Sequence, residues 1–151
     1  HDNTDCGAAC IATICRQQGY NISISKIREI AGTDKRGTNV YGMIQALNTL
    51  RFKVKGVKTK EINNDILREK ISLPCIAHVI VNDSLLHYVV IYKITKKHII
   101  IADPAEGVMK IRIDEFIGKS ETAISISGQV CVYFLLKIIN LIKHLQRVMY
   151  F

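Results

Sequence analysis

The spacing of apolar residues divides the chain into a helical first third and a β-rich remainder. In the first third, apolar positions recur every three or four residues between polar ones, which predicts amphipathic helices. Small polar residues and glycines stand at the expected ends of these helices, where they cap the free backbone groups. We expect a first helix over 6–18, with Asp5 as N-cap and Gly19 as stop. A second is expected from Ser23 or Ser25 to Gly32, and a third over 40–50, capped by Thr38 or Asn39.

From residue 52 onward the pattern changes to short apolar or alternating runs, which predict strands. Three of these runs are separated by "NDS" and "TKK", which are typical of hairpin turns. Helices followed by mostly antiparallel strands predict an α+β domain, with N-terminal helices packed on the sheet. Strands are expected at 52–59 (an edge strand), 74–81, 85–94, 98–104, 107–113 and 129–136, and short helical segments at 63–71 and 114–119.

Residues 137–151 have a pattern of their own. Apolar side chains such as Ile138 and Leu141 fall on one helical face, and basic ones such as Lys143 fall on the other. We therefore divide the chain into a domain over 1–136 and an amphipathic tail helix over 137–151. Three roles are open to this helix: binding a membrane surface, docking on a partner, or packing on the core.

Composition and charge narrow the possible partners. A chain of 151 residues with 48% hydrophobic residues is long enough to bury one core, so one globular domain is expected. The formal net charge of +8 favours an acidic partner. The basic residues are scattered and not interleaved with aromatic ones, so nucleic acid is not the expected partner. No apolar run reaches the length of about 18 residues that indicates a membrane span.

The five cysteines differ in their surroundings. They lack the paired spacing of a structural zinc site, and no Cys-x-x-Cys redox pair is present, so no metal is expected. Cys10, Cys15, Cys75 and Cys131 lie within apolar segments, as small buried side chains do. Cys6 stands in the first turn of a helix among small residues, where free N–H groups and the helix dipole stabilise a thiolate. Cys6 is therefore the candidate nucleophile.

A nucleophilic cysteine needs a base, and His87 is the best candidate. A hairpin that folds at residue 95 places His87 opposite Asp103, and a fold at residue 96 makes them diagonal neighbours. The carboxylate would then hold the imidazole in line with the thiol. The alternative is that His87 only packs in the sheet, while Asp103 caps the turn before Pro104.

Five segments of the sequence occur in an order that resembles a known family. They are "DCGAACIATI", "IAGTDKRGTNVYGMIQAL", "LPCIAHV", "HYVVIYKI" and "IADPAEG". Together they resemble the N-terminal cysteine peptidase domain of ABC transporters that process and export bacteriocins and related peptides, from about Asp2 to Leu136. The resemblance implies a papain-like fold and cleavage of a leader peptide after a Gly-Gly or Gly-Ala-like pair. It implies no cofactor for this domain, because ATP would be bound by a separate nucleotide-binding domain.

The resemblance also assigns roles to individual residues. It matches Cys6 to the nucleophile that forms a thioester, His87 to the general base, and Asp103 to the residue that orients the base. The family's oxyanion hole uses a glutamine about six residues before the cysteine, a position just upstream of His1 and not in this chain. The backbone N–H of Cys6 is the other expected donor.

The implied partners are a precursor peptide and the other parts of a transporter. The precursor would carry an amphipathic, acidic leader helix, and the domain would lie on the cytoplasmic side of a bacterial plasma membrane, joined to transmembrane and nucleotide-binding parts. A non-catalytic leader-docking module and a thiol acyltransferase with the same triad are the alternatives. One wall of the leader groove is expected from "NVYGMIQAL", which also fits a plain core helix, through Val40, Tyr41, Met43, Ile44 and Leu47.

Overall fold

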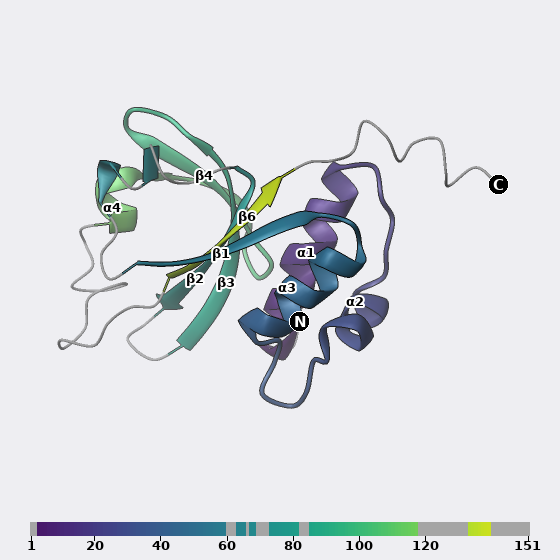
Figure 1. Cartoon of the computed structure of the whole chain (residues 1–151). Helices are drawn as coiled ribbons and strands as arrows, with labels where there is room; N and C mark the ends of the chain where they lie inside the picture. Colours follow the sequence, from purple (N-terminus) through teal and green to yellow (C-terminus); the bar gives the residue numbers. More distant parts are fainter. Residues whose placement is uncertain are drawn as a thin grey trace.

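The chain folds as three N-terminal helices followed by a mostly antiparallel sheet, which confirms the predicted α+β class (Figure 1). The computed structural model describes residues 3–59, 63–65, 67–68, 73–81, 85–117 and 133–139. The elements are η1 (Asn3–Asp5), α1 (Cys6–Gln17), α2 (Ile24–Ala31), α3 (Val40–Thr49), β1 (Lys53–Thr59), β2 (Cys75–Val81), β3 (Leu85–Ile94), β4 (His98–Asp103), β5 (Gly107–Arg112), α4 (Ile113–Ile117) and β6 (Tyr133–Ile139).

Side-chain caps fix the starts of α2 and α3. The Ser23 hydroxyl accepts a hydrogen bond from the backbone N–H of Lys26 at 3.2 Å, and the Asn39 side chain accepts one from Gly42 at 2.8 Å. Of the alternatives left open by the sequence, Ser23 and Asn39 are therefore the N-caps. The helix α2 ends at Gly32, whose φ of 62° lies in the left-handed region that glycine adopts without strain.

The start of α1 is held in a different way. Asp5 occupies the N-cap position, as predicted, but its side chain makes no capping hydrogen bond. Instead, its carboxylate Oδ1 lies 2.9 Å from Nη1 of Arg28. The prediction of a side-chain capping bond from Asp5 is therefore wrong, because the carboxylate is turned toward the guanidinium of Arg28. The resulting ion pair ties the start of α1 to α2.

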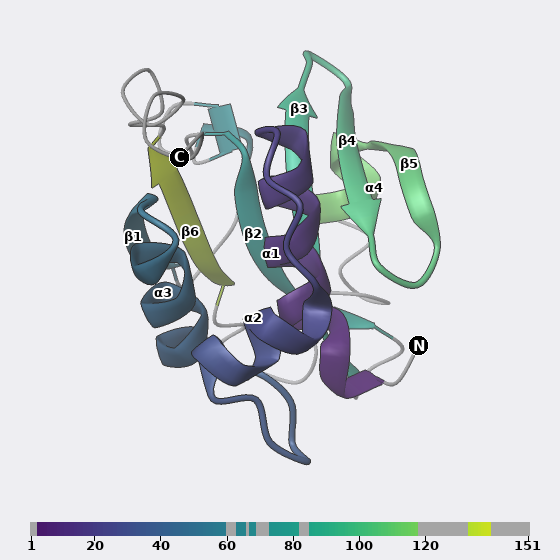
Figure 2. The same ribbon diagram turned by 90° about the vertical axis from the view of Figure 1, so that its right-hand side faces the viewer.

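Within the described residues, six strands form one sheet in the order β1-β6-β2-β3-β4-β5. All neighbouring strands run antiparallel, and β1 lies at an edge, as the alternation of its sequence predicts. The helices α1, α2 and α3 lie on one side of the sheet and α4 on the other (Figure 1). In the rotated view, α1 lies against the middle of the sheet, where it contacts β3 (Figure 2).

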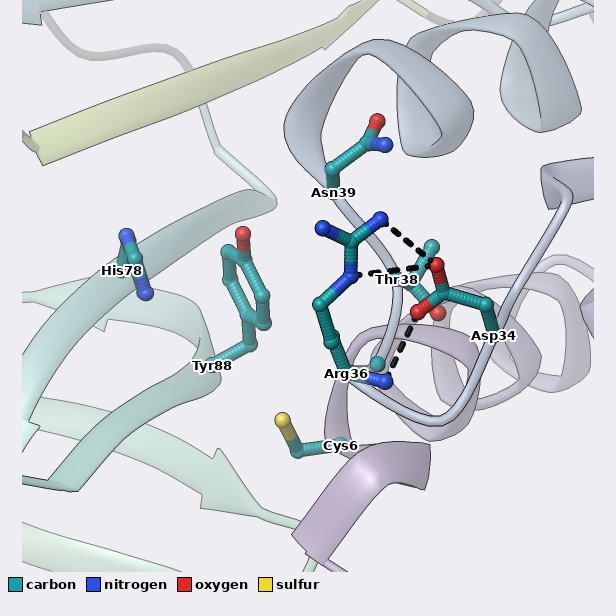
Figure 3. A pocket seen from close by; sticks show the side chains of 8 residues that line it. Cys6, Asp34, Arg36, Thr38, Asn39, His78 and Tyr88 are labelled. Atoms are coloured by element: carbon teal, nitrogen blue, oxygen red, sulfur yellow. Dashed lines mark hydrogen bonds and ion pairs between the residues drawn. The ribbon is translucent and has the colours of Figure 1, made fainter.

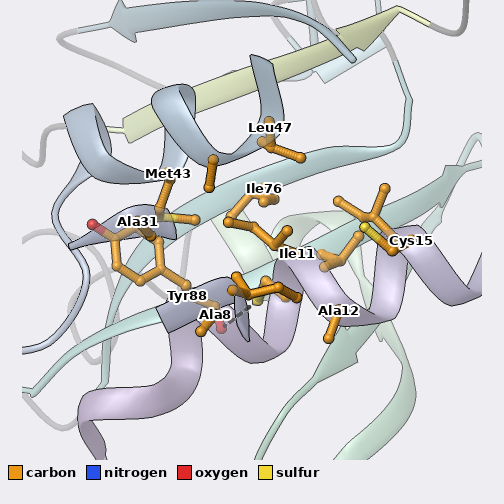
Figure 4. Packing of buried hydrophobic residues seen from close by; sticks show 14 of the residues in the cluster. Ala8, Ile11, Ala12, Cys15, Ala31, Met43, Leu47, Ile76 and Tyr88 are labelled. Atoms are coloured by element: carbon orange, nitrogen blue, oxygen red, sulfur yellow. Dashed lines mark hydrogen bonds between the residues drawn. The ribbon is translucent and has the colours of Figure 1, made fainter. Parts of the chain in front are cut away.

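Two apolar clusters cover the two faces of the sheet. The first lies between the sheet and α1, α2 and α3, and the second lies between the sheet and α4. Ile11, Met43, Leu47 and Ile76 are among the fully buried members of the first cluster (Figure 4). The helix that carries Cys6 is thus fixed to the sheet by its apolar face.

The burial of α3 corrects the predicted leader groove. Met43 and Leu47 are fully buried, because their face of α3 packs against α1 and the sheet, so neither can line a groove. Val40 and Ile44 are partly buried against the same cluster. Tyr41 differs, with 71% of its surface exposed. Of the five predicted residues, Tyr41 is therefore the best placed to meet a peptide.

The predicted helix over 137–151 begins too early. The strand β6 runs through Ile139, whose register partner in β1 is Lys53. Backbone pairing with the neighbouring strands outweighs the helical spacing of these three residues. The rest of that helix, the first half of the predicted strand 129–136 and part of the predicted helix 63–71 lie outside the described residues. Among the described residues, no helix is long and apolar enough to span a membrane.

Candidate active site

The site lies where the first turn of α1 meets β3. Cys6 is the first residue of α1, and the imidazole of His87 on β3 lies close enough to its thiol to lower the pKa of the thiol. Glycine at position 7 allows this turn to approach the α2–α3 loop, because an added Cβ there would lie 3.0 Å from Cβ of Thr38. The sequence-predicted nucleophile and base are therefore brought together.

Asp103 completes the arrangement from β4. Its Oδ1 lies 2.8 Å from Nε2 of His87, and the two side chains are only 10% and 11% exposed. With Nε2 facing the carboxylate, Nδ1 is the ring nitrogen left for the thiol. The register pairs Val90 with Ala102, beyond a bulge between Ile91 and Lys93. This is the register of a fold at residue 96, so His87 and Asp103 are diagonal neighbours.

Asp103 also caps the turn that follows β4, which was the alternative to a contact with His87. Its Oδ1 accepts hydrogen bonds from the backbone N–H groups of Ala105 at 2.7 Å and Glu106 at 3.4 Å. The turn after β4 therefore holds the carboxylate in place while the carboxylate holds His87. The contacts of both alternatives are present together, and the turn pre-organises the contact between Asp103 and His87.

Electrostatics favour a charged pair. Burial raises the pKa of the Cys6 thiol. Hydrogen bonds with His87 and the Tyr88 backbone lower it, as does the positive charge of His87, and these effects together outweigh burial. The pKa of Cys6 therefore lies below its ordinary value. The hydrogen bond with Cys6 raises the pKa of His87 to about 9 against the opposing effect of burial, and Asp103 adds to the rise. The two side chains thus favour each other's charged forms, a thiolate beside an imidazolium.

The other described cysteines do not compete as nucleophiles. Cys10 and Cys75 are fully buried, as is Cys15, which confirms their prediction as small core side chains. Burial raises the pKa of Cys10 well above its ordinary value and that of Cys15 to about 11, so both stay protonated. Cys131 lies outside the described residues.

A pocket of about 350 Å³ opens beside the Cys6 sulfur (Figure 3). The loop between α2 and α3 forms one wall, and His78 and Tyr88 form the other. This loop is a tight turn: the backbone N–H of Gly37 donates to the Asp34 carbonyl at 3.0 Å. The φ of Gly37 is 104°, a left-handed conformation that favours glycine, and its Cα packs near the backbone of Thr4.

His78 and Tyr88 form a wall of the pocket that the sequence analysis did not predict, and the same holds for the loop opposite them. Their rings stack with centroids 4.3 Å apart and planes 17° from parallel. Burial, together with the charge of His87, lowers the pKa of His78, so its ring stays neutral. The signal was present, because a hairpin that turns in "NDS" pairs positions 78 and 88, as the register shows. No acidic partner marked His78, so its place beside the pocket was not expected.

The fold and the site define a class of protein. A low-pKa cysteine at a helix N-terminus, facing an imidazole on an adjacent sheet, is the arrangement of cysteine peptidases. Among the described residues, no group of three or more His, Cys, Asp or Glu side chains is arranged to hold a metal ion. The sequence matches the Peptidase C39 family over residues 1–126, and the chain belongs to this family.

Similar sequences include transport proteins and a shorter protein. The chain is 41% identical over 116 residues to the lactococcin-G-processing and transport ATP-binding protein LagD of Lactococcus lactis subsp. lactis, a match that covers 76% of this chain and 16% of LagD. It is 38% identical over 111 residues to the uncharacterized protein MTBMA_c00490 of Methanothermobacter marburgensis, covering 74% of this chain and 72% of that protein. The chain thus spans about a sixth of the transport relative.

Solved structures show the same fold. The peptidase domain of Streptococcus ComA, a bi-functional ABC transporter involved in a quorum sensing pathway, superimposes with a TM-score of 0.70 at 27% identity, covering 91% of this chain and 93% of that one. A double glycine motif protease from an AMS/PCAT transporter, in complex with the leader peptide, gives a TM-score of 0.68 at 24% identity, covering 89% and 84%. The papain-like α+β prediction is therefore confirmed.

Proposed function

We propose that this chain is the peptidase domain of an ABC transporter and cleaves the leader of bacteriocin-type or related precursor peptides after a Gly-Gly or Gly-Ala-like pair. The observation that carries the proposal is the linked contact of Cys6 with His87 and of His87 with Asp103 at 2.8 Å. The transport relatives, whose printed names include processing of lactococcin G, support the substrate class.

The first half-reaction transfers the leader to the enzyme. The Cys6 thiolate attacks the carbonyl carbon of the second leader glycine, so a C–S bond forms and the oxygen takes the negative charge. The backbone N–H of Cys6, the first residue of α1, is the proposed first donor to this oxyanion. A glutamine upstream of His1 is the proposed second donor. The imidazolium of His87 then protonates the departing amine, the C–N bond breaks, and a thioester remains.

The second half-reaction releases the leader. Neutral His87 accepts a proton from a water molecule, and the resulting hydroxide attacks the thioester carbonyl. The C–S bond breaks, the leader leaves with a free carboxylate, and Cys6 and His87 return to the thiolate–imidazolium pair. Asp103 holds the ring in one orientation through both steps, and two backbone N–H groups that also bind its Oδ1 keep the carboxylate in place.

The pocket explains a preference for glycine before the cut. The α2–α3 loop and the Tyr88–His78 stack face each other beside the sulfur (Figure 3), so a side chain on the residue before the cut would have to fit between them. Missing methyl groups alone discriminate by only about 10- to 200-fold. We therefore expect the remaining specificity to come from a leader helix bound outside the pocket.

Tyr41 is the proposed contact for this leader helix. It is 71% exposed and lies two residues after Asn39, which lines the pocket. An apolar side chain of an amphipathic leader can cover such a ring. Arg36 lines the pocket with a largely exposed side chain that is paired with Asp34 at 3.0 Å, so an acidic leader residue would share this guanidinium with Asp34.

Tyr41→Ala is expected to raise KM for a full-length precursor by about threefold to tenfold and to change kcat less than twofold, because the leader contact contributes to binding alone. The matched control is Val108→Ala, which removes an equally exposed apolar side chain from β5. The measurement is steady-state cleavage monitored by chromatography. Equal KM values for the two variants would remove Tyr41 from the proposed leader contact.

The transporter context is part of the same proposal. The domain would lie on the cytoplasmic side of a bacterial plasma membrane and act on the precursor before export, alongside transmembrane and nucleotide-binding parts. The proposed peptidase needs no cofactor, since its thiolate, acid and base are side chains of this chain. Nucleic acid has no role in the proposal.

Mass spectrometry of a double-glycine precursor after incubation with the chain tests the function. A peptidase yields a leader with a free carboxylate and a core peptide with a free amine. A thiol acyltransferase gives a new amide, and a docking module leaves the precursor whole. Cys6→Ala is expected to bind the leader but not to cut it, and cleavage by this variant at the parent rate would contradict the assigned nucleophile.

A further inference from the structure

The helix α1 presents two thiols to β3, one turn apart. Cys6 and Cys10 are four residues apart and therefore lie on the same helical face. The Cys10 side chain is fully buried, and its Sγ donates a hydrogen bond to the backbone carbonyl of Tyr88 at 3.3 Å. Tyr88 directly follows His87, so this bond lies one residue from the catalytic imidazole.

The Tyr88 peptide lies at the active-site end of β3. The strand pairs with β4 from Val90 to Ile94, and Tyr88 lies beyond the end of that pairing. There the Cys10 thiol gives the Tyr88 carbonyl a donor from the helix. The backbone of the same residue also acts on Cys6, because hydrogen bonding with it lowers the pKa of the Cys6 thiol. Two of the three cysteines of α1, Cys6 and Cys10, therefore contact one residue of β3.

We propose that Cys10 is a positioning residue for the Cys6–His87 pair, which it holds in place through its hydrogen bond to the Tyr88 peptide. This inference deepens the proposed peptidase function and rests on it for the kinetic arm of its test. Apolar packing already holds α1 against β3, and the Cys10 thiol adds a hydrogen bond of defined length between them. The bonded carbonyl belongs to the peptide between Tyr88 and Val89, so a shift of it would move the Tyr88 Cα and, through the preceding peptide bond, the His87 backbone.

A core filler and a positioning residue respond differently to substitution. If Cys10 only fills space, alanine costs stability through the lost sulfur and leaves the chemistry of Cys6 unchanged. If it positions the pair, loss of the donor weakens the contacts that stabilise the thiolate and lowers its reactivity. Serine separates the two roles, because its hydroxyl donates to the same carbonyl. Valine fills the site without a donor.

The experiment measures Cys6 alkylation by iodoacetamide in the 151-residue chain and, separately, kcat and KM for a double-glycine precursor. Peptide mapping confirms the modified residue. Cys10→Ala is expected to slow alkylation at pH 7 and to lower kcat, each by about threefold to thirtyfold, because a displacement of under an ångström impairs a catalytic pair. KM is expected to stay within about twofold, since Cys10 lies outside the pocket. Cys10→Ser is expected to recover most of both rates.

The matched control is Cys15→Ala, which removes another fully buried thiol from the same helix. It is expected to lower the unfolding temperature and to leave both rates near the parent values. If Cys10→Ala does not fold, serine is compared with valine at the same position.

The inference is overturned if Cys10→Ala, or Cys10→Val in its place, alkylates and turns over like the parent. It is also overturned if serine fails to recover the rates, since side-chain volume and not the hydrogen bond would then be the cause. Failure of the proposed function gives a different result, because no variant, the parent included, would cut the precursor, while the alkylation rates would still report the role of Cys10.

Discussion

At the level of single residues, the chemistry of Cys6 depends on a balance between burial and hydrogen bonding. Burial is the largest individual effect and opposes ionisation, yet the contacts with His87 and the Tyr88 backbone together exceed it. The raised pKa of His87 is the other side of the same balance, because each partner stabilises the charge of the other. The thiolate therefore depends on a few well-placed contacts.

Asp103→Asn is expected to move the alkaline limit of activity to lower pH. The Asp103 carboxylate is one cause of the rise in the pKa of His87 to about 9, so removing its charge lowers that pKa. Because imidazolium His87 must protonate the leaving amine, kcat/KM should decline at lower pH in the variant than in the parent, whose decline is expected near pH 9. The pH dependence of kcat/KM measures this shift. An unchanged alkaline limb would mean that Asp103 does not act on His87.

The sequence predicted which side chains come together where the signals are local. Cys6 was marked by its helix N-terminus, and His87 and Asp103 by the length of their hairpin. His78 and Tyr88 were missed because their role arises from ring stacking beside a pocket formed by a distant loop. It was harder still to predict which apolar side chains of α3 line a groove and which lie in the core, since both kinds of position carry the same residue types.

At the level of elements, close packing of α2 against α3 sets the position of the pocket loop between them. Gly42 allows this packing, because a Cβ at that position would lie 2.1 Å from the carbonyl oxygen of Ala31. That separation is far inside van der Waals contact, and the obstacle is backbone, which cannot rotate away. The two helices must therefore separate if position 42 carries a side chain.

Gly42→Ala is expected to lower the free energy of unfolding by about 1–3 kcal/mol, the usual cost of overpacking, despite the better helix propensity of alanine. Urea or thermal unfolding measures this loss. Gln45→Ala, on the exposed side of the same helix, is the matched control and should be close to neutral. If Gly42→Ala were as stable as the control, the close approach of α2 and α3 would not be real.

The ion pair between Asp5 and Arg28 gives a prediction for α1 and α2. Arg28→Ala is expected to cost less than about 1 kcal/mol of stability, because the pair is partly exposed. It leaves the Asp5 carboxylate uncompensated next to Cys6, and a negative charge there raises the pKa of a thiol. Alkylation of Cys6 at neutral pH should therefore slow.

Two comparisons complete this prediction. Lys26→Ala breaks the exposed Lys26–Glu29 pair on the same helix and should leave the alkylation rate unchanged. Adding Asp5→Asn to Arg28→Ala should restore the rate, because the uncompensated charge is gone. A double variant as slow as Arg28→Ala alone would show that the guanidinium acts by some means other than neutralising Asp5.

Element boundaries were predictable where a cap or a turn fixes them. Ser23, Gly32 and Asn39 define their helices through local hydrogen bonds and backbone conformation, which a sequence shows directly. The end of β6 was not predictable in this way, because Ile139 belongs to the strand through pairing with Lys53, a residue far away in the chain. Local helical spacing predicted the opposite.

At the level of the whole molecule, the fold brings the N-terminal end of α1, in the helical layer, against the face of the sheet. The order of helices and then strands was enough to predict an α+β domain, since helices need a sheet face to cover. The sequence left two registers open between β3 and β4, one for a hairpin that folds at residue 95 and one for a fold at residue 96. The structure has the register of a fold at residue 96, with a bulge between Ile91 and Lys93. The active site depends on this junction of α1, β3 and β4.

The most direct test of the central claim is acid quenching of a reaction between the chain and a double-glycine precursor, followed by mass spectrometry of the protein. We predict a transient adduct with the mass of the leader acyl group, located on the peptide that contains Cys6 and absent from Cys6→Ala. Cleavage without an adduct at any quench time, or an adduct on another cysteine, would contradict the claim that the Cys6 thiolate is the nucleophile.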